Sequence, residues 1–214
     1  MGDTEGRGRI VVLNGAPRSG KSSIVAAIQE TFEGPWLNLG VDVFVRQVTP
    51  ERLRPGIGLR PGGERPDLEA VIPALYAAMY ESIAAHARLG LNVVVDVGHH
   101  DAYSQPLGIL PDCARRLSGL YALFVGVRCP IEVIVERRRA GQPGREGQYL
   151  AGAAGESVPV PVALWQTEVH RPGVYDLEVD TSLLSPRECA DAIRARMADG
   201  PAPSAFQWLA RMDA

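Results

Sequence analysis

The chain has 214 residues, of which 46% are hydrophobic and 22% are charged, as in average soluble globular proteins. This length suits one domain with a full core and is too short for two ordinary domains joined by a linker. The net charge of −3 excludes a general basic field. We therefore expect neither a dedicated nucleic-acid binder nor a membrane-surface binder.

The N-terminal residues do not combine a basic start, an apolar run and a cleavage site, and no run reaches the roughly 20 apolar residues of a membrane span. We expect a cytoplasmic protein. The cysteines Cys113, Cys129 and Cys189 are odd in number and widely spaced, which indicates buried free thiols rather than a zinc site. The oligomeric state stays open, a homo-oligomer included.

The first third of the chain alternates strand and helix patterns. Residues 10–13 form a continuous apolar, β-branched run, which is typical of a buried parallel strand. After a glycine-rich turn, the apolar residues of 24–32 keep the spacing of a helix packed on a sheet. Residues 36–41 indicate a second strand. Strand, loop and helix in this order begin a βαβ unit.

The middle of the chain starts with an unusual loop. Residues 50–66 are rich in Pro, Gly and Arg and form too long a segment for a simple connection. Helical spacing then runs from Asp67 to Gly90, where a glycine suits a helix C-terminus. Residues 92–97 are strand-like.

The last third continues the alternation. We expect a strand over 121–127, a helix over 130–139, a strand over 176–179 and a helix from Ser185 to Met197, with Ser185 as N-cap. Strands that alternate with helices predict a three-layer α/β fold with a parallel five-stranded sheet. In the tail, the apolar residues are expected to dock on the body; they are Phe206, Trp208 and Leu209.

One motif stands out between the first strand and the first helix. Residues 15–22 match G-x-x-x-x-G-K-[ST] at every fixed position, in the strand-to-helix context that a phosphate-binding loop requires. The alternative is a chance glycine-rich turn. The residues expected to bind nucleotide are Gly15, Ala16, Pro17, Arg18, Ser19, Gly20, Lys21, Ser22 and Ser23.

The chemistry explains these residue types. Backbone N–H groups of a tight loop and a helix N-terminus can surround a polyphosphate where side chains stay away, as at Gly15 and Gly20. Lys21, the only lysine in the chain, then reaches the β- and γ-phosphates. The Ser22 hydroxyl is expected to bind Mg²⁺. Such a motif indicates a nucleotide but does not by itself indicate a kinase.

Two acidic residues follow predicted strands, where ligands of open α/β sheets bind. Asp42 could accept the proton of an attacking hydroxyl, or it could cap the segment that begins at Val43; the residues alone leave both interpretations open. Asp96 follows three valines and is placed like a carboxylate that holds Mg²⁺, directly or through water. Its alternative is a hydrogen-bonding residue at a strand end.

Paired histidines follow Asp96 closely. His99 and His100 could contact the acceptor or a phosphate, but histidines in a glycine-containing loop are more often solvated polar groups. The sequence offers no third ligand that would complete a zinc site with them.

Arginines cluster at the end of the predicted helix over 130–139. Arg137, Arg138 and Arg139 precede a Gly/Pro-rich segment that carries Arg145. Arginines on a hinged segment are what a phosphoryl-transfer lid needs, whereas the alternative is helix-dipole complementarity and solubility. We predict Arg137 and Arg138 as catalytic contacts. Arg128, just past the fourth strand, could border the adenine.

With these residues in view, the chain resembles the chloramphenicol phosphotransferase family of the P-loop kinase group. The stretches that carry the resemblance are residues 10–22, 35–37, 40–42, the valine strand that ends at Asp96, and residues 125–129, 169–173 and 175–181.

The resemblance implies ATP as donor, Mg²⁺ as ion, Asp42 as catalytic base, and the arginines around Arg137 as lid contacts. Tyr175 and Asp176 stay open between architecture and site. We expect a single P-loop kinase-like domain over 1–200, with acceptor-binding insertions around 43–67 and a lid around 137–163. Residues 201–214 form the tail.

The expected activity is ATP-dependent phosphorylation of a hydroxyl of an antibiotic, in resistance or in biosynthesis. Residues 43–67, the histidine pair and residues 147–163 depart from the pattern expected of an enzyme for chloramphenicol. A nucleoside antibiotic, for example of the capuramycin type, is therefore a second acceptor class. The alternatives are a kinase of a small metabolite or nucleoside, and a regulatory protein that binds ATP without transferring phosphate.

Overall fold

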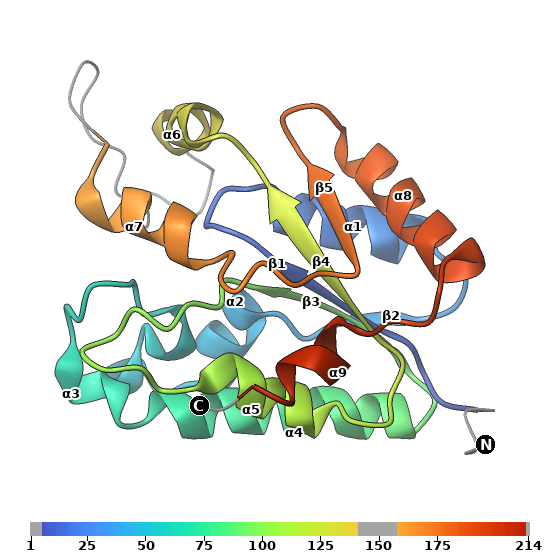
Figure 1. Ribbon diagram of the computed structural model, residues 1–214, viewed down its shortest axis with the longest axis horizontal. Coiled ribbons are helices and arrows are strands. Elements are labelled where there is room, and N and C mark those ends of the chain that lie inside the picture. The colour runs from blue at the N-terminus through green and yellow to red at the C-terminus, as the bar shows by residue number, and fades with distance from the viewer. Residues whose placement is uncertain (1–5, 141–157, 213–214) are drawn as a thin grey trace.

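The computed structural model describes residues 6–140 and 158–212, and a parallel sheet runs through its centre (Figure 1). The strands are β1 (Ile10–Asn14), β2 (Trp36–Asn38), β3 (Asn92–Val97), β4 (Ala122–Arg128) and β5 (Leu177–Asp180). They form one five-stranded sheet in the order β2-β3-β1-β4-β5, and every strand pair is parallel. The predicted α/β class and strand number are confirmed.

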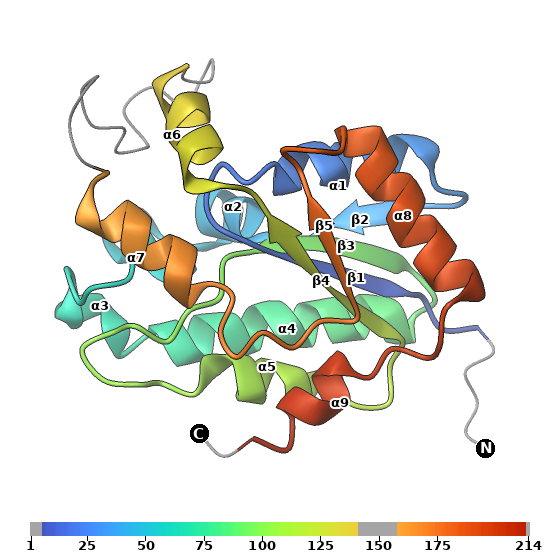
Figure 2. The same ribbon diagram turned by 45° about the horizontal axis from the view of Figure 1, so that its top comes forward.

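Helices cover both faces of the sheet, as Figure 2 shows. One layer consists of α1 (Lys21–Thr31) and α8 (Pro186–Asp199); the other consists of α4 (Ile72–Arg88), α5 (Ile109–Arg116) and α9 (Ala205–Leu209). Successive side chains of a strand point to opposite faces of the sheet, so each strand packs against both helix layers. In β1, Val11 and Leu13 pack toward the first layer, and Ile10 and Val12 pack toward the second.

Two further helices lie beyond the carboxyl ends of the strands (Figure 2). They are α6 (Ile131–Arg139) and α7 (Val160–Glu168). A separate apolar cluster joins them to the start of the phosphate loop; it contains Ala16, Cys129, Ile134, Val162, Trp165 and Val169. The sequence indicated neither α5 nor α7, because each is short and flanked by irregular segments.

The second strand is shorter than expected. β2 ends at Asn38, because the Asn38 side-chain oxygen accepts a hydrogen bond of 2.9 Å from the Gly40 N–H, which turns the chain. A short helix α2 (Val41–Val43) follows and continues as a π-helical turn over Phe44–Val48. Asp42 therefore lies in a helical turn and not directly at a strand end.

The long loop and the helix after it also differ from expectation. The loop contains 3₁₀ turns η2 (Glu51–Leu53) and η3 (Gly56–Gly58), and the expected helix splits into α3 (Pro66–Glu69) and α4. A proline lies in the first turn of α4, where its missing N–H is tolerated, so a new helix starts there. The end of α4 is as predicted, because Gly90 adopts a φ of 86° after it.

The C-terminal part agrees with the sequence. Ser185 caps α8 in a capping box with Glu188, and the tail docks through α9, in which Phe206 and Leu209 are buried. Trp208 was also expected to dock, but it is 51% exposed. Asp176 anchors this tail: its carboxylate accepts hydrogen bonds from the backbone N–H groups of Phe124, Ser204 and Ala205. Asp176 is thus architectural.

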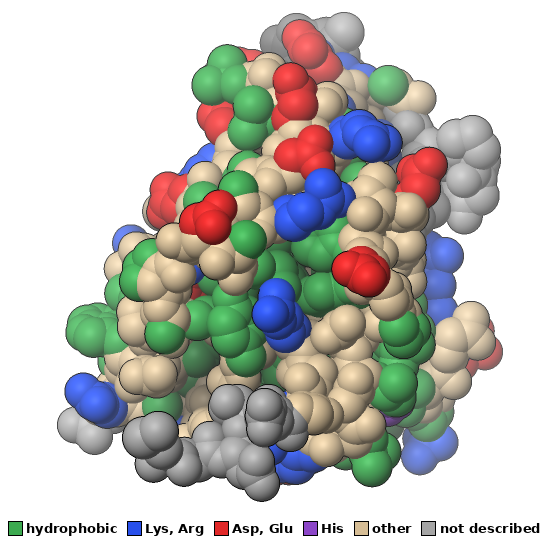
Figure 3. Space-filling model, turned by 90° about the vertical axis from the view of Figure 1, so that its right-hand side faces the viewer, with side chains coloured by type: hydrophobic (Ala, Val, Ile, Leu, Met, Phe, Trp, Pro, Cys, Tyr) green, Lys and Arg blue, Asp and Glu red, His purple; other side chains and the backbone are tan. Residues whose placement is uncertain are grey.

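The three cysteines are free and buried, as expected. Within the described residues, no helix is long and apolar enough to cross a membrane. Figure 3 shows the side of the molecule away from α6 and α7, where acidic, basic and hydrophobic side chains are interspersed. This face carries no extended field of one sign.

Candidate active site

A cavity of about 740 Å³ opens at the carboxyl ends of β1 and β3. One part of its wall is the phosphate loop and the start of α1, a second is α2 with η3, and a third is α7. Its lining includes Gly15, Pro17, Arg18, Gly20, Lys21, Ser22, Ser23, Asp42, Asp96, Arg137, Arg138, Trp165 and Thr181. The structure thus brings most of the predicted site residues to one cavity.

The phosphate loop has the tight geometry that its sequence indicates. A Cβ at Gly15 would lie 2.6 Å from the Val127 carbonyl oxygen, and Gly20 adopts a φ of 97°, so a side chain is disfavoured at both positions. Arg18 also has a positive φ, of 73°. The side chains of Ala16 and Ser19, which belong to the loop, are buried.

The loop holds Lys21 by its own carbonyl groups. The Lys21 Nζ donates hydrogen bonds to the carbonyl oxygens of Gly15, at 2.7 Å, and Ala16, at 2.9 Å. Burial lowers the pKa of Lys21 to about 8, while Asp96 and Asp42 oppose this shift. A phosphate group in the cavity would favour the charged ammonium, which is what a phosphate-binding lysine requires.

Ser22 and Asp96 form the oxygen pair expected of a magnesium site. The Ser22 hydroxyl donates a hydrogen bond of 2.8 Å to the Asp96 carboxylate, and Asp96 is 8% exposed. The chain passes close to this carboxylate, because a Cβ at Gly40 would lie 1.8 Å from the Asp96 Oδ1. In the described residues no cluster of three or more His, Cys, Asp or Glu could hold a metal, but Mg²⁺ commonly takes few protein ligands beside phosphate oxygens and water. The pair therefore fits Mg²⁺.

Asp42 reaches the same cavity from α2. Its charge acts on Lys21, so the carboxylate lies within electrostatic range of the phosphate loop. The lining of this cavity also contains apolar residues, among them Val41, Val45, Ile57, Leu59, Val162 and Trp165. The sequence did not identify these residues, because apolar side chains that line a cavity have the same pattern as those of a core.

Arg137 joins the phosphate loop to the segment after β5. Its guanidinium donates to the Thr181 hydroxyl, at 3.0 Å, and to the Thr181 carbonyl, at 2.7 Å. The Arg18 guanidinium in turn donates to the Arg137 carbonyl. Arg138 is 8% exposed and donates to the Pro17 carbonyl at 3.4 Å. Both predicted arginines therefore lie at the cavity as contacts of the loop, whereas Arg145 and most of the expected lid lie outside the described residues.

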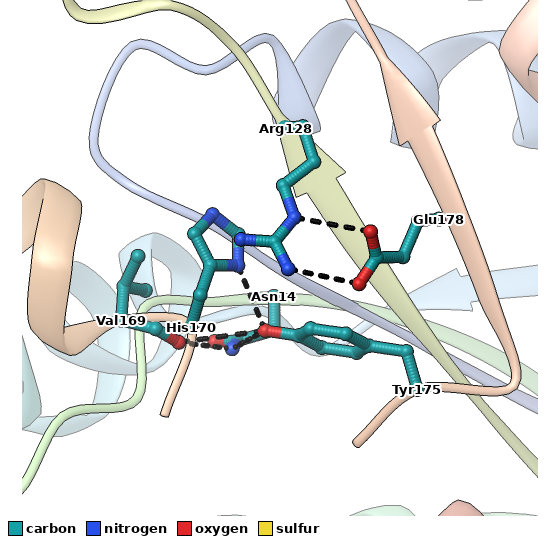
Figure 4. Close-up of polar contacts among 6 residues, drawn as sticks. All are labelled: Asn14, Arg128, Val169, His170, Tyr175 and Glu178. Atoms are coloured by element: carbon teal, nitrogen blue, oxygen red, sulfur yellow. Dashed lines mark hydrogen bonds and ion pairs between the residues drawn. The ribbon is translucent and has the colours of Figure 1, made fainter. Parts of the chain in front are cut away.

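Arg128 does not lie in the lining of this cavity. Figure 4 shows it in an ion pair with Glu178, with a closest distance of 2.8 Å, and its guanidinium lies over the Tyr175 ring. The structure therefore gives no support to the expected contact with adenine. An arginine and a glutamate on adjacent strands attract each other, and the sequence did not reveal that pairing.

The same close-up shows a polar network behind the phosphate loop (Figure 4). The Asn14 amide donates to the Val169 carbonyl, at 2.7 Å, and to the Tyr175 hydroxyl, at 2.9 Å. Tyr175 also contacts His170 at 2.9 Å, and burial lowers the pKa of His170 to about 4. Tyr175 is thus part of the support for the loop.

The expectation of solvated histidines at 99 and 100 is wrong. His99 is 2% exposed, lies 2.7 Å from the Tyr80 hydroxyl and stacks on Tyr76; burial lowers its pKa to about 3. His100 is also buried, and its Nε2 lies 2.9 Å from the Leu59 carbonyl oxygen. Both partners come from distant segments, so local sequence could not show them.

Comparison with known proteins identifies phosphotransferases as relatives of this chain. The chloramphenicol phosphotransferase-like protein family matches residues 8–198. A Mycobacterium tuberculosis protein named "Putative O-phosphotransferase" is 27% identical over 215 residues, which cover 94% of this chain and 88% of that protein.

Solved structures of P-loop kinases share the fold. A sugar kinase from Janibacter sp. has a TM-score of 0.56 and 18% identity, with 89% of this chain and 93% of that chain covered. The Mycobacterium tuberculosis APS kinase, solved with AMPPNP and APS, has a TM-score of 0.55 and 20% identity, with 89% and 98% covered. Together with the phosphate loop and the match over most of its length, these findings mean that this chain is a phosphotransferase with the P-loop kinase fold and belongs to the chloramphenicol phosphotransferase-like family.

Proposed function

We propose that this chain is an ATP-dependent O-phosphotransferase that phosphorylates a hydroxyl group of a small-molecule antibiotic. The observation that carries the proposal is the shared cavity, in which the Asp42 carboxylate and the phosphate loop line one space. A protein that only senses ATP needs no carboxylate at that position. A phosphotransferase needs one to accept the proton of the attacking hydroxyl.

The chain's own residues account for the transfer as follows. Lys21 and the loop N–H groups bind the β- and γ-phosphates. The acceptor oxygen attacks the γ-phosphorus, its proton passes to Asp42, and the bond between the γ-phosphorus and the bridging oxygen of ADP breaks. Arg138, held against the Pro17 carbonyl, adds positive charge next to the loop as negative charge spreads over the transferred group.

Ser22 and Asp96 are the residues that would hold Mg²⁺. The ion would offset charge on the β- and γ-phosphates. The cavity lining also includes residues that come after β5, namely Thr181, Leu184 and Pro186. Thr181 lies next to Gly20 of the phosphate loop, so these residues provide a surface for the nucleotide base. This base contact takes the place of the one expected at Arg128.

The antibiotic acceptor is supported by two observations. The family takes its name from chloramphenicol, and the cavity that Asp42 lines also has apolar lining residues, Trp165 among them, which suits a drug-like body with an aromatic or heterocyclic group. The wall residues Ile57 and Leu59 belong to the 43–67 segment, which departs from the chloramphenicol pattern. A nucleoside antibiotic with a free sugar hydroxyl is therefore an acceptor to test beside chloramphenicol.

The test is mass spectrometry of reactions that contain the protein, ATP, Mg²⁺ and one antibiotic each. We expect the mass of one added phosphoryl group on chloramphenicol or on a nucleoside antibiotic, and no addition with the Asp42→Asn variant. Products from sugars or other metabolites, with none from any antibiotic, would support a metabolite kinase. ATP binding with no product from any acceptor would overturn the proposal in favour of a nucleotide-binding regulator.

A further inference from the structure

The acceptor end of the cavity contains a cation that the proposed transfer does not use. Arg60 follows η3, is half-buried and lines the same cavity as Asp42 and Lys21. Within residues 6–140 and 158–212, its guanidinium forms no hydrogen bond or ion pair with a side chain or carbonyl. A charge that is partly removed from water is normally paired. A ligand in the cavity could therefore provide the partner of the Arg60 guanidinium.

The other arginines of the lining differ from Arg60 in this respect. Arg18 donates to the Arg137 carbonyl, Arg137 is bound to Thr181, and Arg138 contacts the Pro17 carbonyl. Arg65 forms an ion pair with Asp67 at 2.8 Å, so its charge is balanced locally. Arg60 is thus the lining arginine that stays available to a ligand in the described part of the chain.

Arg60 also stands on a fixed backbone. The Tyr76 hydroxyl donates to the Ile57 carbonyl at 3.1 Å, and the Gly62 N–H donates to the Ala102 carbonyl at 2.8 Å. Between them, His100 contacts the Leu59 carbonyl; since a carbonyl only accepts, the His100 Nε2 carries the proton. These bonds hold both sides of Arg60, and a cation on a fixed backbone binds a ligand with little cost of ordering.

The surroundings favour a ligand group with one negative charge. The neighbouring Ile57 and Leu59 side chains are buried and apolar, which strengthens a charge-assisted hydrogen bond from the guanidinium. Glu64 lies in the same lining and would repel a dianion such as a phosphate monoester. A guanidinium fork matches the planar shape of a carboxylate.

We propose that Arg60 binds a carboxylate of the acceptor, so that the preferred acceptor among antibiotics carries a carboxylate as well as its hydroxyl, with a largely apolar body between these two polar ends. Chloramphenicol has no carboxylate and would be a poorer acceptor. The hydroxyl lies at Asp42 and the carboxylate at Arg60. This inference rests on the proposed function for the hydroxyl end, whereas the carboxylate end can be measured by binding alone. Arg60 is a specificity-determining residue in this scheme and takes no part in the transfer step.

The experiment uses matched probes with and without the charge. 4-(Hydroxymethyl)benzoate and its homologues, longer by one and two methylene groups, are compared with their primary amides. Binding is followed by Trp165 fluorescence in the presence of a non-hydrolysable ATP analogue, and the Trp165→Phe variant identifies the signal. Transfer from ATP to the same probes is measured separately as kcat/KM.

We expect the unmodified protein to bind the best acid about tenfold or more tightly than its amide, the range of a hydrogen bond to a charged group. Arg60→Gln should remove this preference. Arg52→Gln, which makes the same charge change at an exposed residue outside the cavity, should keep it. Equal binding of acids and amides, or a preference that persists in Arg60→Gln, would overturn the inference. A preference for acids without any transfer would support the carboxylate site and count against the proposed function.

Discussion

The pKa of Lys21 predicts how nucleotide affinity depends on pH. In the free protein, burial lowers this pKa to about 8, so the ammonium form falls from about nine-tenths at about pH 7 to about one-tenth at about pH 9. Phosphate groups stabilise the ammonium, so the bound state keeps its proton. Binding above about pH 8 must therefore take up a proton, and affinity falls as pH rises.

The size of the effect follows from these fractions. The apparent Kd should rise about tenfold between about pH 7 and about pH 9, which corresponds to about 1.4 kcal/mol. Isothermal titration with a non-hydrolysable ATP analogue, without divalent metal, measures this at several pH values. It should also detect proton uptake as a dependence of the heat on the ionisation enthalpy of the buffer.

The Lys21→Ala variant is the control for ionisation of the nucleotide itself. It should bind weakly at every pH, and the loss of affinity that begins near pH 8 should be absent. If the affinity of the unmodified protein does not fall above about pH 8, or if that of Lys21→Ala falls in the same way, the assignment of the buried ammonium to phosphate binding is wrong.

Three substitutions test the remaining parts of the site and its support. Asp42→Asn should leave the Kd for nucleotide nearly unchanged and lower kcat by about 100-fold or more, the contribution of a general base; near-normal kcat in rapid-quench assays would exclude that role. Gly40→Ala should displace the Asp96 carboxylate, since the added Cβ would lie 1.8 Å from it, and raise the Mg²⁺ concentration needed for half-maximal rate. Gly58→Ala, where the nearest atom lies at 3.7 Å, should not change it. Asp176→Ala leaves three backbone N–H groups without their acceptor and should cost about 2 kcal/mol or more of unfolding free energy in urea titrations, while an unchanged midpoint would contradict its anchoring role.

The sequence predicted those parts of the fold that depend on local pattern. The buried strand β1 and the loop after it were recognisable because a parallel strand is apolar throughout and the loop has fixed residue types at fixed spacing. The capping box at Ser185 is equally local. The end of β2 was missed, because Val41 is as apolar as a strand residue and the turn depends on one side-chain bond of Asn38.

Side chains whose partners lie far along the chain were the least predictable. His99 has the sequence context of a solvated loop residue, yet Tyr76 and Tyr80 of α4 enclose it. Arg128, which was expected to border the adenine, pairs with Glu178 on the neighbouring strand, and local sequence did not reveal this partner. The roles of Asp42, Arg137 and Arg138 stay predictions, although the structure places all three at the cavity.

The bond between Asn14 and the Val169 carbonyl has a consequence for changing acceptor range by protein engineering. Val169 follows α7, whose residues Val162 and Trp165 line the cavity, and Asn14 directly precedes the phosphate loop. Because one amide connects both segments, an outward shift of α7 that moves Val169 would break a buried hydrogen bond of the residue that precedes the phosphate loop. Variants that trim side chains, such as Val162→Ala, are therefore a better route to bulkier acceptors than grafting a different helix.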